Sequence, residues 1–292
     1  GGLADAAVAT FLVEAIFKYI CGDFVGIAFL GEVGAASGGM GAVAAAALAG
    51  LATQIFFGFV FIMVYVAFYG SGTPEADITL SEIIPYLWLN QAFFSLIYIW
   101  HKDNEIMNMI KKGDVAYELC RPQNLYWMWY IRILASKLSA VLLRCVPLLI
   151  IAFLMPSPYN LTLPASISAF IFFVISLIIA TLLVTALVTL MYLLIFYSVD
   201  SKGVMGMYCG IAEILSGQVI AIPLFPTLLR NIAVLLPFAY ISDFSFRIYS
   251  GNIMGTQIIQ GLIIQITWLI IIVILGMISS NKILKRVSVQ GG

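Results

Sequence analysis

The stretch ISAFIFFVISLIIATLLVTALVTLMYLLIFY, residues 167–197, decides the fold class of this chain. It contains no charged residue, and about 20 apolar residues are enough for a helix to cross about 30 Å of hydrocarbon. Strands of a membrane barrel alternate apolar and polar residues over about ten positions, which this stretch does not do. Residues 258–278 form another continuous apolar run. We therefore predict an all-α membrane protein.

The composition of the whole chain agrees with that prediction. Apolar residues make up 63% and charged residues 10% of the 292 positions, against about 25% charged residues in soluble domains. The formal net charge is zero, so no basic surface for nucleic acid is expected. The four cysteines lack the paired spacing of a disulfide framework or a metal site, and we expect neither a metal nor a catalytic cluster.

Six segments are long and apolar enough to be membrane spans. They are residues 43–69, 83–101, 128–155, 165–198, a segment that starts near 204 and loses its regularity near Pro223 and Pro226, and 256–280. Together they predict one six-helix transmembrane domain over residues 42–286.

The distribution of Lys and Arg predicts the orientation, because cytoplasmic loops collect these residues. Placing both termini inside puts most of the loop cations in the cytoplasm: Lys102, Lys111, Lys112, Arg121, Lys202, Lys282, Lys285 and Arg286. The opposite side then holds mainly acidic residues. We predict that both termini are cytoplasmic.

Residues 1–41 fit this scheme less well. Glu14 and Lys18 lie within the apolar stretch at 11–20, Asp5 and Asp23 flank it, and residues 31–41 are rich in glycine. We expect an interfacial helix. An additional span, which would move the N-terminus outside, and a disordered or non-native segment are the alternatives.

The connection between the second and third spans, residues 102–122, is the most informative polar segment. Ile106, Met109 and Ile110 recur at helical spacing among polar residues, which predicts an amphipathic helix that ends at Gly113. Asp114 can cap a second short helix. A solvated loop is the simpler interpretation, but the apolar stripe favours docking to a cytosolic partner.

A second informative segment spans residues 217–250. Pro223, Pro226 and Pro237 interrupt an apolar sequence, and broken helix at membrane depth is tolerated only where it is buried in protein or lines a cavity. We predict two short helices that enter the outer leaflet and return. An ordinary kinked span is the alternative.

Charged residues inside the spans are candidate functional residues, because their burial in lipid is costly. Lys137 and Arg144 share one helix face. Glu213 is expected near the middle of the membrane, facing a transport path or pairing with a cation such as Arg144. Snorkelling of Arg144 and an internal structural pair for Glu213 are the alternatives. Gly206 and Gly210 have the spacing that lets helices approach closely.

The order of these segments resembles the permease subunit of type-2 ATP-binding-cassette (ABC) exporters, in their six-helix bacterial branch. The matching residues are Lys112-Gly113-Asp114, Glu118-Leu119, Arg121-Pro122, Arg132, Lys137-Leu138, Arg144, Gly217, Ile222-Pro223-Leu224-Phe225-Pro226 and Leu236-Pro237-Phe238. The resemblance covers about residues 45–285. Its individual motifs are loose, and only their order and spacing are specific.

The resemblance implies a function and a set of site residues. It implies that two permeases, identical or different, form a path for export of a lipid, drug or peptide across the bacterial inner membrane. Separate ATPase subunits would bind ATP and Mg²⁺, since this chain has no phosphate-binding loop and is not expected to be an enzyme. The residues implied to couple to the ATPase are Ile106, Met109, Ile110, Lys111, Lys112, Gly113, Asp114, Glu118 and Arg121. The residues implied at the path or gate are Glu213, Gly217, Pro223, Phe225, Pro226 and Pro237.

Two rival functions follow from the residues themselves. An ion-coupled secondary transporter would use Glu213 as its proton site, although no inverted repeat is evident. An intramembrane enzyme is a weaker alternative, because no histidine cluster or paired carboxylates lie on one helix.

Overall fold

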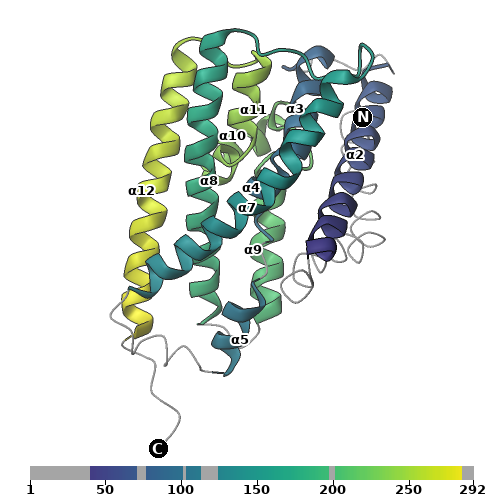
Figure 1. The fold of residues 1–292 in the computed structure, drawn as a ribbon. Helices are drawn as coiled ribbons and strands as arrows, with labels where there is room; N and C mark the ends of the chain where they lie inside the picture. The colour runs from purple at the N-terminus through teal and green to yellow at the C-terminus, as the bar shows by residue number, and fades with distance from the viewer. Residues whose placement is uncertain (1–39, 71–76, 101–102, 113–123, 197–200, 285–292) are drawn as a thin grey trace, which may run out of the picture.

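The computed structural model describes residues 40–70, 77–100, 103–112, 124–196 and 201–284, and every regular element within these ranges is helical (Figure 1). The elements are α2 (Met40–Gly70), α3 (Leu80–Ala92), α4 (Phe94–Ile97), α5 (Asn104–Lys112), α7 (Leu125–Leu154), α8 (Ile167–Ile195), α9 (Ser201–Leu215), η1 (Ile222–Leu224), α10 (Thr227–Leu235), η2 (Pro237–Tyr240), α11 (Asp243–Ser250) and α12 (Thr256–Leu284). The predicted all-α fold class is confirmed, and the long apolar helices are consistent with a multi-pass membrane protein.

Four of the described helices, α2, α7, α8 and α12, are long and apolar enough to cross a membrane. The expected second span is divided between α3 and α4, and the expected fifth span yields the 15-residue helix α9. The count of six spans therefore stays a prediction. Residues 1–39, which were expected to form an interfacial helix, lie outside the described residues.

Helix α8 is the centre of the bundle. Most residues of its apolar window are buried, whereas fewer than a quarter are buried in the corresponding windows of α2, α7 and α12. Helix α12 packs along one side of α8, α7 crosses it obliquely, and α2 lies beside α3 at the far side (Figure 1). The second half of α8 is thus largely covered by protein, whereas Ile167, Ile171 and Ile178 in its first half are exposed. The outer helices leave many apolar side chains exposed, as expected of a surface that faces lipid.

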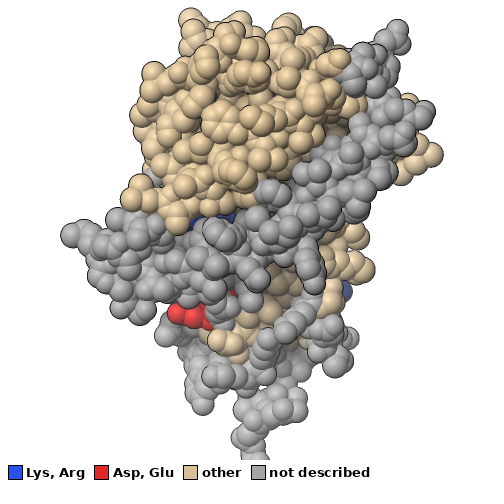
Figure 2. All heavy atoms as spheres, turned by 90° about the vertical axis from the view of Figure 1, so that its right-hand side faces the viewer, with Lys and Arg blue, Asp and Glu red and all other residues tan. Residues whose placement is uncertain are grey.

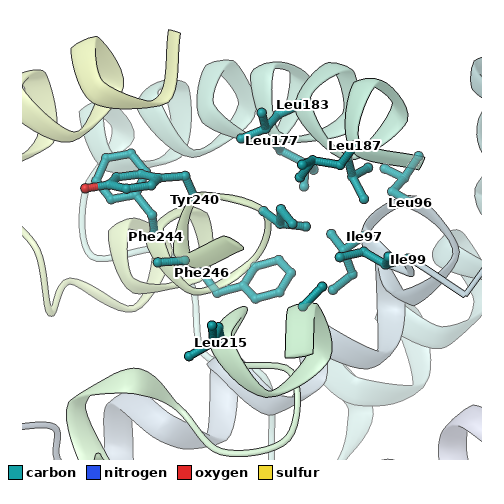
Figure 3. Packing of buried hydrophobic residues seen from close by; sticks show 14 of the residues in the cluster. Leu96, Ile97, Ile99, Leu177, Leu183, Leu187, Leu215, Tyr240, Phe244 and Phe246 are labelled. Atoms are coloured by element: carbon teal, nitrogen blue, oxygen red, sulfur yellow. The ribbon is translucent and has the colours of Figure 1, made fainter. Parts of the chain in front are cut away.

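The core joins α8 to the segment after α3 and to α11. Leu96, Ile97 and Ile99 lie near Leu187 of α8, and Phe246 of α11 points into the same cluster (Figure 3). Buried polar side chains in this region include Ser176, Ser245 and Gln265, which hydrogen-bond to one another or to the backbone.

One such polar group is an amide in α12. Gln265 Nε2 donates to the carbonyls of Ser176 and Tyr240, at 3.0 and 2.8 Å, and its Oε1 accepts from the Ser176 hydroxyl at 3.1 Å. This amide ties α12 to α8 and η2, as burial of a polar group requires.

Charged side chains occupy little of the described surface in the face that Figure 2 shows. Figure 2 shows the face at the right of Figure 1, where the described residues form a broad area without charge and only small areas of red and blue. Such a surface is suited to lipid or to another apolar surface.

Candidate functional site at a discontinuous helix

The helix that follows the first described span is interrupted within the bundle. Helix α3 ends at Ala92, α4 covers only four residues, and Tyr98 has an extended backbone with φ −67° and ψ 125°. The end of a helix leaves carbonyl groups without partners inside the helix, and these need partners elsewhere when they are buried. The discontinuity therefore creates a row of polar groups inside an apolar bundle.

Side chains from neighbouring segments bind these carbonyl groups. Lys137 Nζ of α7 donates to the carbonyl oxygens of Leu96 at 3.2 Å and Tyr98 at 2.5 Å. Gln218 Nε2, from the loop after α9, donates to the Ile97 carbonyl at 2.9 Å. Donors from two other parts of the fold thus satisfy the carbonyl groups at the end of α4 and in the unwound segment, residues 98–100.

Three further polar contacts surround the same segment. Cys209 Sγ lies 3.8 Å from the Ile99 carbonyl oxygen, as a weak donor. Asn90 Nδ2 donates to the Gln218 carbonyl at 3.0 Å, and Trp100 Nε1 donates to Glu213 Oε2 at 2.7 Å. Amide, carboxylate and indole groups therefore gather where α3, α4, α7 and α9 meet.

The loop that supplies Gln218 is anchored by a buried carboxylate. Asp243 Oδ1 accepts from the Tyr86 hydroxyl at 3.2 Å and from the Ile222 amide at 3.1 Å, and its Oδ2 accepts from Arg247 at 3.3 Å. The Tyr86 hydroxyl also lies 2.7 Å from the Gly217 carbonyl oxygen, to which it donates. Helices α3 and α11 together position the residues on either side of Gln218.

Gly217 has no room for a side chain. Its φ is +80°, and a Cβ at this position would lie 2.8 Å from Tyr86 Oη and 3.0 Å from Asp243 Cβ. Both the left-handed backbone and the close approach require glycine. This residue was predicted to line a path or gate, and the structure gives it a position in the turn that carries Gln218.

The three predicted prolines each begin a short helix. Pro223 lies in the first turn of η1, Pro226 precedes α10, and Pro237 is the first residue of η2. Proline is favoured at these positions because its fixed φ suits a helix start and its missing N–H costs nothing there. Phe225 is buried between η1 and α10. The segment thus contains short helices, as expected, and its depth in the outer leaflet stays a prediction.

At one end of the bundle, an ion pair joins the segment before α3 to α10, and a hydrogen bond joins that segment to the residues after α11. Arg230 pairs with Asp77, and Asn252 Nδ2 donates to the Asp77 carbonyl at 2.9 Å. The hydrogen bond from Arg230 lowers the pKa of the Asp77 carboxyl below its usual range. These contacts hold the short helices against α3 on the side away from α5 (Figure 1).

The amphipathic helix expected near residues 106–110 is present as α5. However, its apolar face packs within this chain: Ile106 is fully buried, and Met109 and Ile110 are partly buried against the same core. Asp103 accepts from the backbone amides of Glu105 and Ile106, and Arg132 of α7 pairs with Asp103 at 2.7 Å. The stripe was interpreted as a surface for a partner, but it seats α5 on its own bundle.

The two predicted intramembrane cations have different surroundings. Lys137 contacts the unwound segment, whereas the guanidinium of Arg144 lies against Gly50 of α2, where a Cβ would be 2.6 Å from its Cζ. Arg144 is buried at this helix contact. Of the remaining predicted residues, Gly113, Asp114, Glu118, Arg121 and the side chains of Lys111 and Lys112 lie outside the described part of the chain.

Sequence reasoning missed the discontinuity and most of its partners. The non-helical residues, Phe93 and residues 98–100, include neither glycine nor proline, so they carry none of the usual signals of an interrupted helix. Asn90, Trp100, Cys209 and Gln218 were not singled out as candidate site residues. Asn90 and Gln91 inside an apolar segment were the available signal, because buried amides need partners.

Comparison with known families gives a different result from the resemblance stated above. Residues 1–111 match the family model described as Phosphotransferase system, EIIC. This match covers less than half of the chain and includes α2, α3, α4 and α5 among the described helices. Searches of curated proteins and of solved structures gave no match.

The expectation of a type-2 ABC exporter permease is therefore wrong. The matched family is a different class of transporter. The expected ATPase subunits, the paired permease and the export cycle depended on the ABC resemblance, so these expectations are wrong as well. The ion-coupled alternative with Glu213 as a proton site also has no support. The reason for the error is that motifs such as Lys-Gly-Asp and Arg-Pro are only two or three residues long, and such short matches arise in unrelated loops. They do not specify a family.

Proposed function

We propose that this chain is the membrane-spanning transport domain of a phosphotransferase-system permease, which binds a sugar beside the discontinuous helix α3–α4 and moves it across the membrane. The match of residues 1–111 to the EIIC family carries the proposal, because that segment contains the whole discontinuous helix. Discontinuous helices commonly form the substrate sites of transporters.

The chemistry beside the break supports a sugar as the substrate. Sugar hydroxyls both donate and accept hydrogen bonds, and they are complemented by amide and carboxylate side chains. Asn90, Gln218 and Glu213 bring such groups to the break. The indole of Trp100 adds a flat apolar surface next to Glu213.

The proposal also assigns partners and orientation. Other components of the phosphotransferase system would supply the phosphoryl group, and this chain would bind and move the sugar. The proposed location is the bacterial inner membrane, and the Lys and Arg distribution supports an orientation with both termini and α5 on the cytoplasmic side. The end with Asp77 and Arg230 would then face outward.

Sugar counterflow in proteoliposomes tests the function. Vesicles containing the purified chain are loaded with one unlabelled hexose or hexitol at a time, and entry of the same labelled sugar is measured. We expect saturable counterflow with at least one member of the panel. Absence of counterflow across the panel, with the protein folded and inserted, would refute the proposed substrate class.

A pair of matched variants tests the location of the site. Glu213→Gln keeps an acceptor for Trp100 but removes the charge, and we expect it to raise the half-saturation concentration about tenfold, as for a lost hydrogen bond to a charged group. Glu105→Gln is the control, because Glu105 is exposed on α5 and pairs with Arg132 of α7, not with the unwound segment. Equal effects of the two substitutions would argue against a site beside the discontinuous helix.

A further inference from the structure

Lys137 places a buried amine at the unwound segment. It lies near the middle of α7, only 2% of its surface is exposed, and Nζ donates to the carbonyl oxygens of Leu96 and Tyr98. Among the described residues, no carboxylate forms an ion pair with it. Backbone carbonyls alone face this amine at hydrogen-bonding distance.

The position of these carbonyls gives the amine a specific role. Unwound carbonyls and helix C-terminal ends at discontinuous helices are the groups that coordinate coupling cations in transporters. The carbonyl end of a helix also carries partial negative charge, which favours a cation. Here the ammonium group of a side chain occupies the place that a mobile cation would take.

We propose that Lys137 is a built-in cation that replaces a coupling ion at the discontinuous helix. Its ammonium group neutralises the carbonyl oxygens of Leu96 and Tyr98 and holds the segment unwound without sodium or potassium. Removal of the side chain leaves a vacant site that accepts a small primary ammonium ion. The cation site lies at the same helix as the proposed sugar site. One consequence, that sugar transport needs no sodium, rests on the proposed function.

Chemical rescue tests the cation site without any sugar. The purified Lys137→Ala variant and the wild-type protein are unfolded thermally in detergent with ethylammonium, sodium or tetraethylammonium chloride at one ionic strength. We expect the variant to lose about 5 °C in Tm or more. Ethylammonium should restore at least half of that loss in a saturable manner, whereas tetraethylammonium is too large to enter.

Two results would overturn the proposal. One is a variant that is as stable as the wild type. The other is a lowered Tm that responds equally to ethylammonium and tetraethylammonium, because that response is general to salt. Restoration by sodium as well as ethylammonium, but not by tetraethylammonium, supports the site, since both ions are small enough to enter.

A second variant keeps the test informative if Lys137→Ala does not fold. Lys137→Met fills similar space without charge, so we expect a lower Tm that ethylammonium does not restore. A Met variant with the wild-type Tm would show that the charge is not needed and would refute the proposal. Because neither measurement uses sugar, a failed rescue leaves the proposed sugar transport standing, and a failed counterflow assay leaves the cation site standing.

Discussion

Trp100 Nε1 donates a hydrogen bond to Glu213 Oε2 over 2.7 Å, which joins the unwound segment after α4 to the middle of the fold at α9. The two residues are 113 positions apart in the sequence. Through this contact, the backbone direction after Tyr98 and the position of the Glu213 carboxylate depend on each other. Any movement of the segment must either break this hydrogen bond or move Trp100 and Glu213 together.

Trp100→Phe tests that dependence. The substitution keeps an aromatic ring but removes the indole donor, and a hydrogen bond to a charged group contributes about 1.5–3 kcal/mol. We expect the half-saturation concentration for sugar counterflow to rise about tenfold or more. Trp127→Phe is the matched control, since Trp127 is partly exposed on α7. A loss of the same size in both variants would indicate a general effect of tryptophan removal.

Gly217→Ala tests the turn that carries Gln218. The new Cβ would be forced into a left-handed backbone against Tyr86 and Asp243, and such strain costs about 1–3 kcal/mol. We expect a clear fall in Tm and weaker counterflow. Gly206→Ala serves as the control, because a Cβ there meets nothing within 4 Å and alanine favours the helix. A Gly217→Ala protein with wild-type Tm would show that the turn tolerates a side chain.

The ion pair of Asp77 and Arg230 predicts that part of the protein's stability is lost as the pH falls. The hydrogen bond from Arg230 lowers the Asp77 pKa in the folded protein below its ordinary value of 3.8. The resulting stabilisation is therefore complete above 3.8 and is lost as the pH falls through the lower folded value. We expect Asp77→Asn to reduce Tm at neutral pH and to match the wild type more closely in strong acid.

Thermal unfolding of both proteins between neutral pH and pH 3 measures this difference. The exposed position of Asp77 makes the effect small, and high salt should reduce it further. A difference in Tm that grew toward acid pH would contradict the assigned sign.

Cysteine labelling tests the orientation. Asn108 is exposed on α5, and Thr162 is exposed between α7 and α8, at the other end of the bundle. In a cysteine-free background, Thr162→Cys should react with an impermeant maleimide on intact cells. Asn108→Cys should react only after the membrane is permeabilised. The reverse pattern would invert the orientation and place α5 outside.

Some features of this protein follow from local sequence. The apolar run at residues 167–197 was enough to predict α8, and the spacing of Ile106, Met109 and Ile110 was enough to predict α5. The three prolines predicted short helices between residues 217 and 250. Hydropathy, helical period and proline geometry act within a few residues, so they can be recognised without the rest of the fold.

The tertiary structure alone decided the discontinuous helix and its partners. Nothing in residues 93–98 forbids a continuous helix. The break is stabilised because Lys137, Gln218 and Cys209 reach its carbonyls from distant parts of the chain. The same is true of α5, whose apolar stripe packs against the core of its own bundle. A buried polar group is stable only if it has a hydrogen-bond partner. Here the partners come from distant parts of the chain, so only the tertiary fold brings them together.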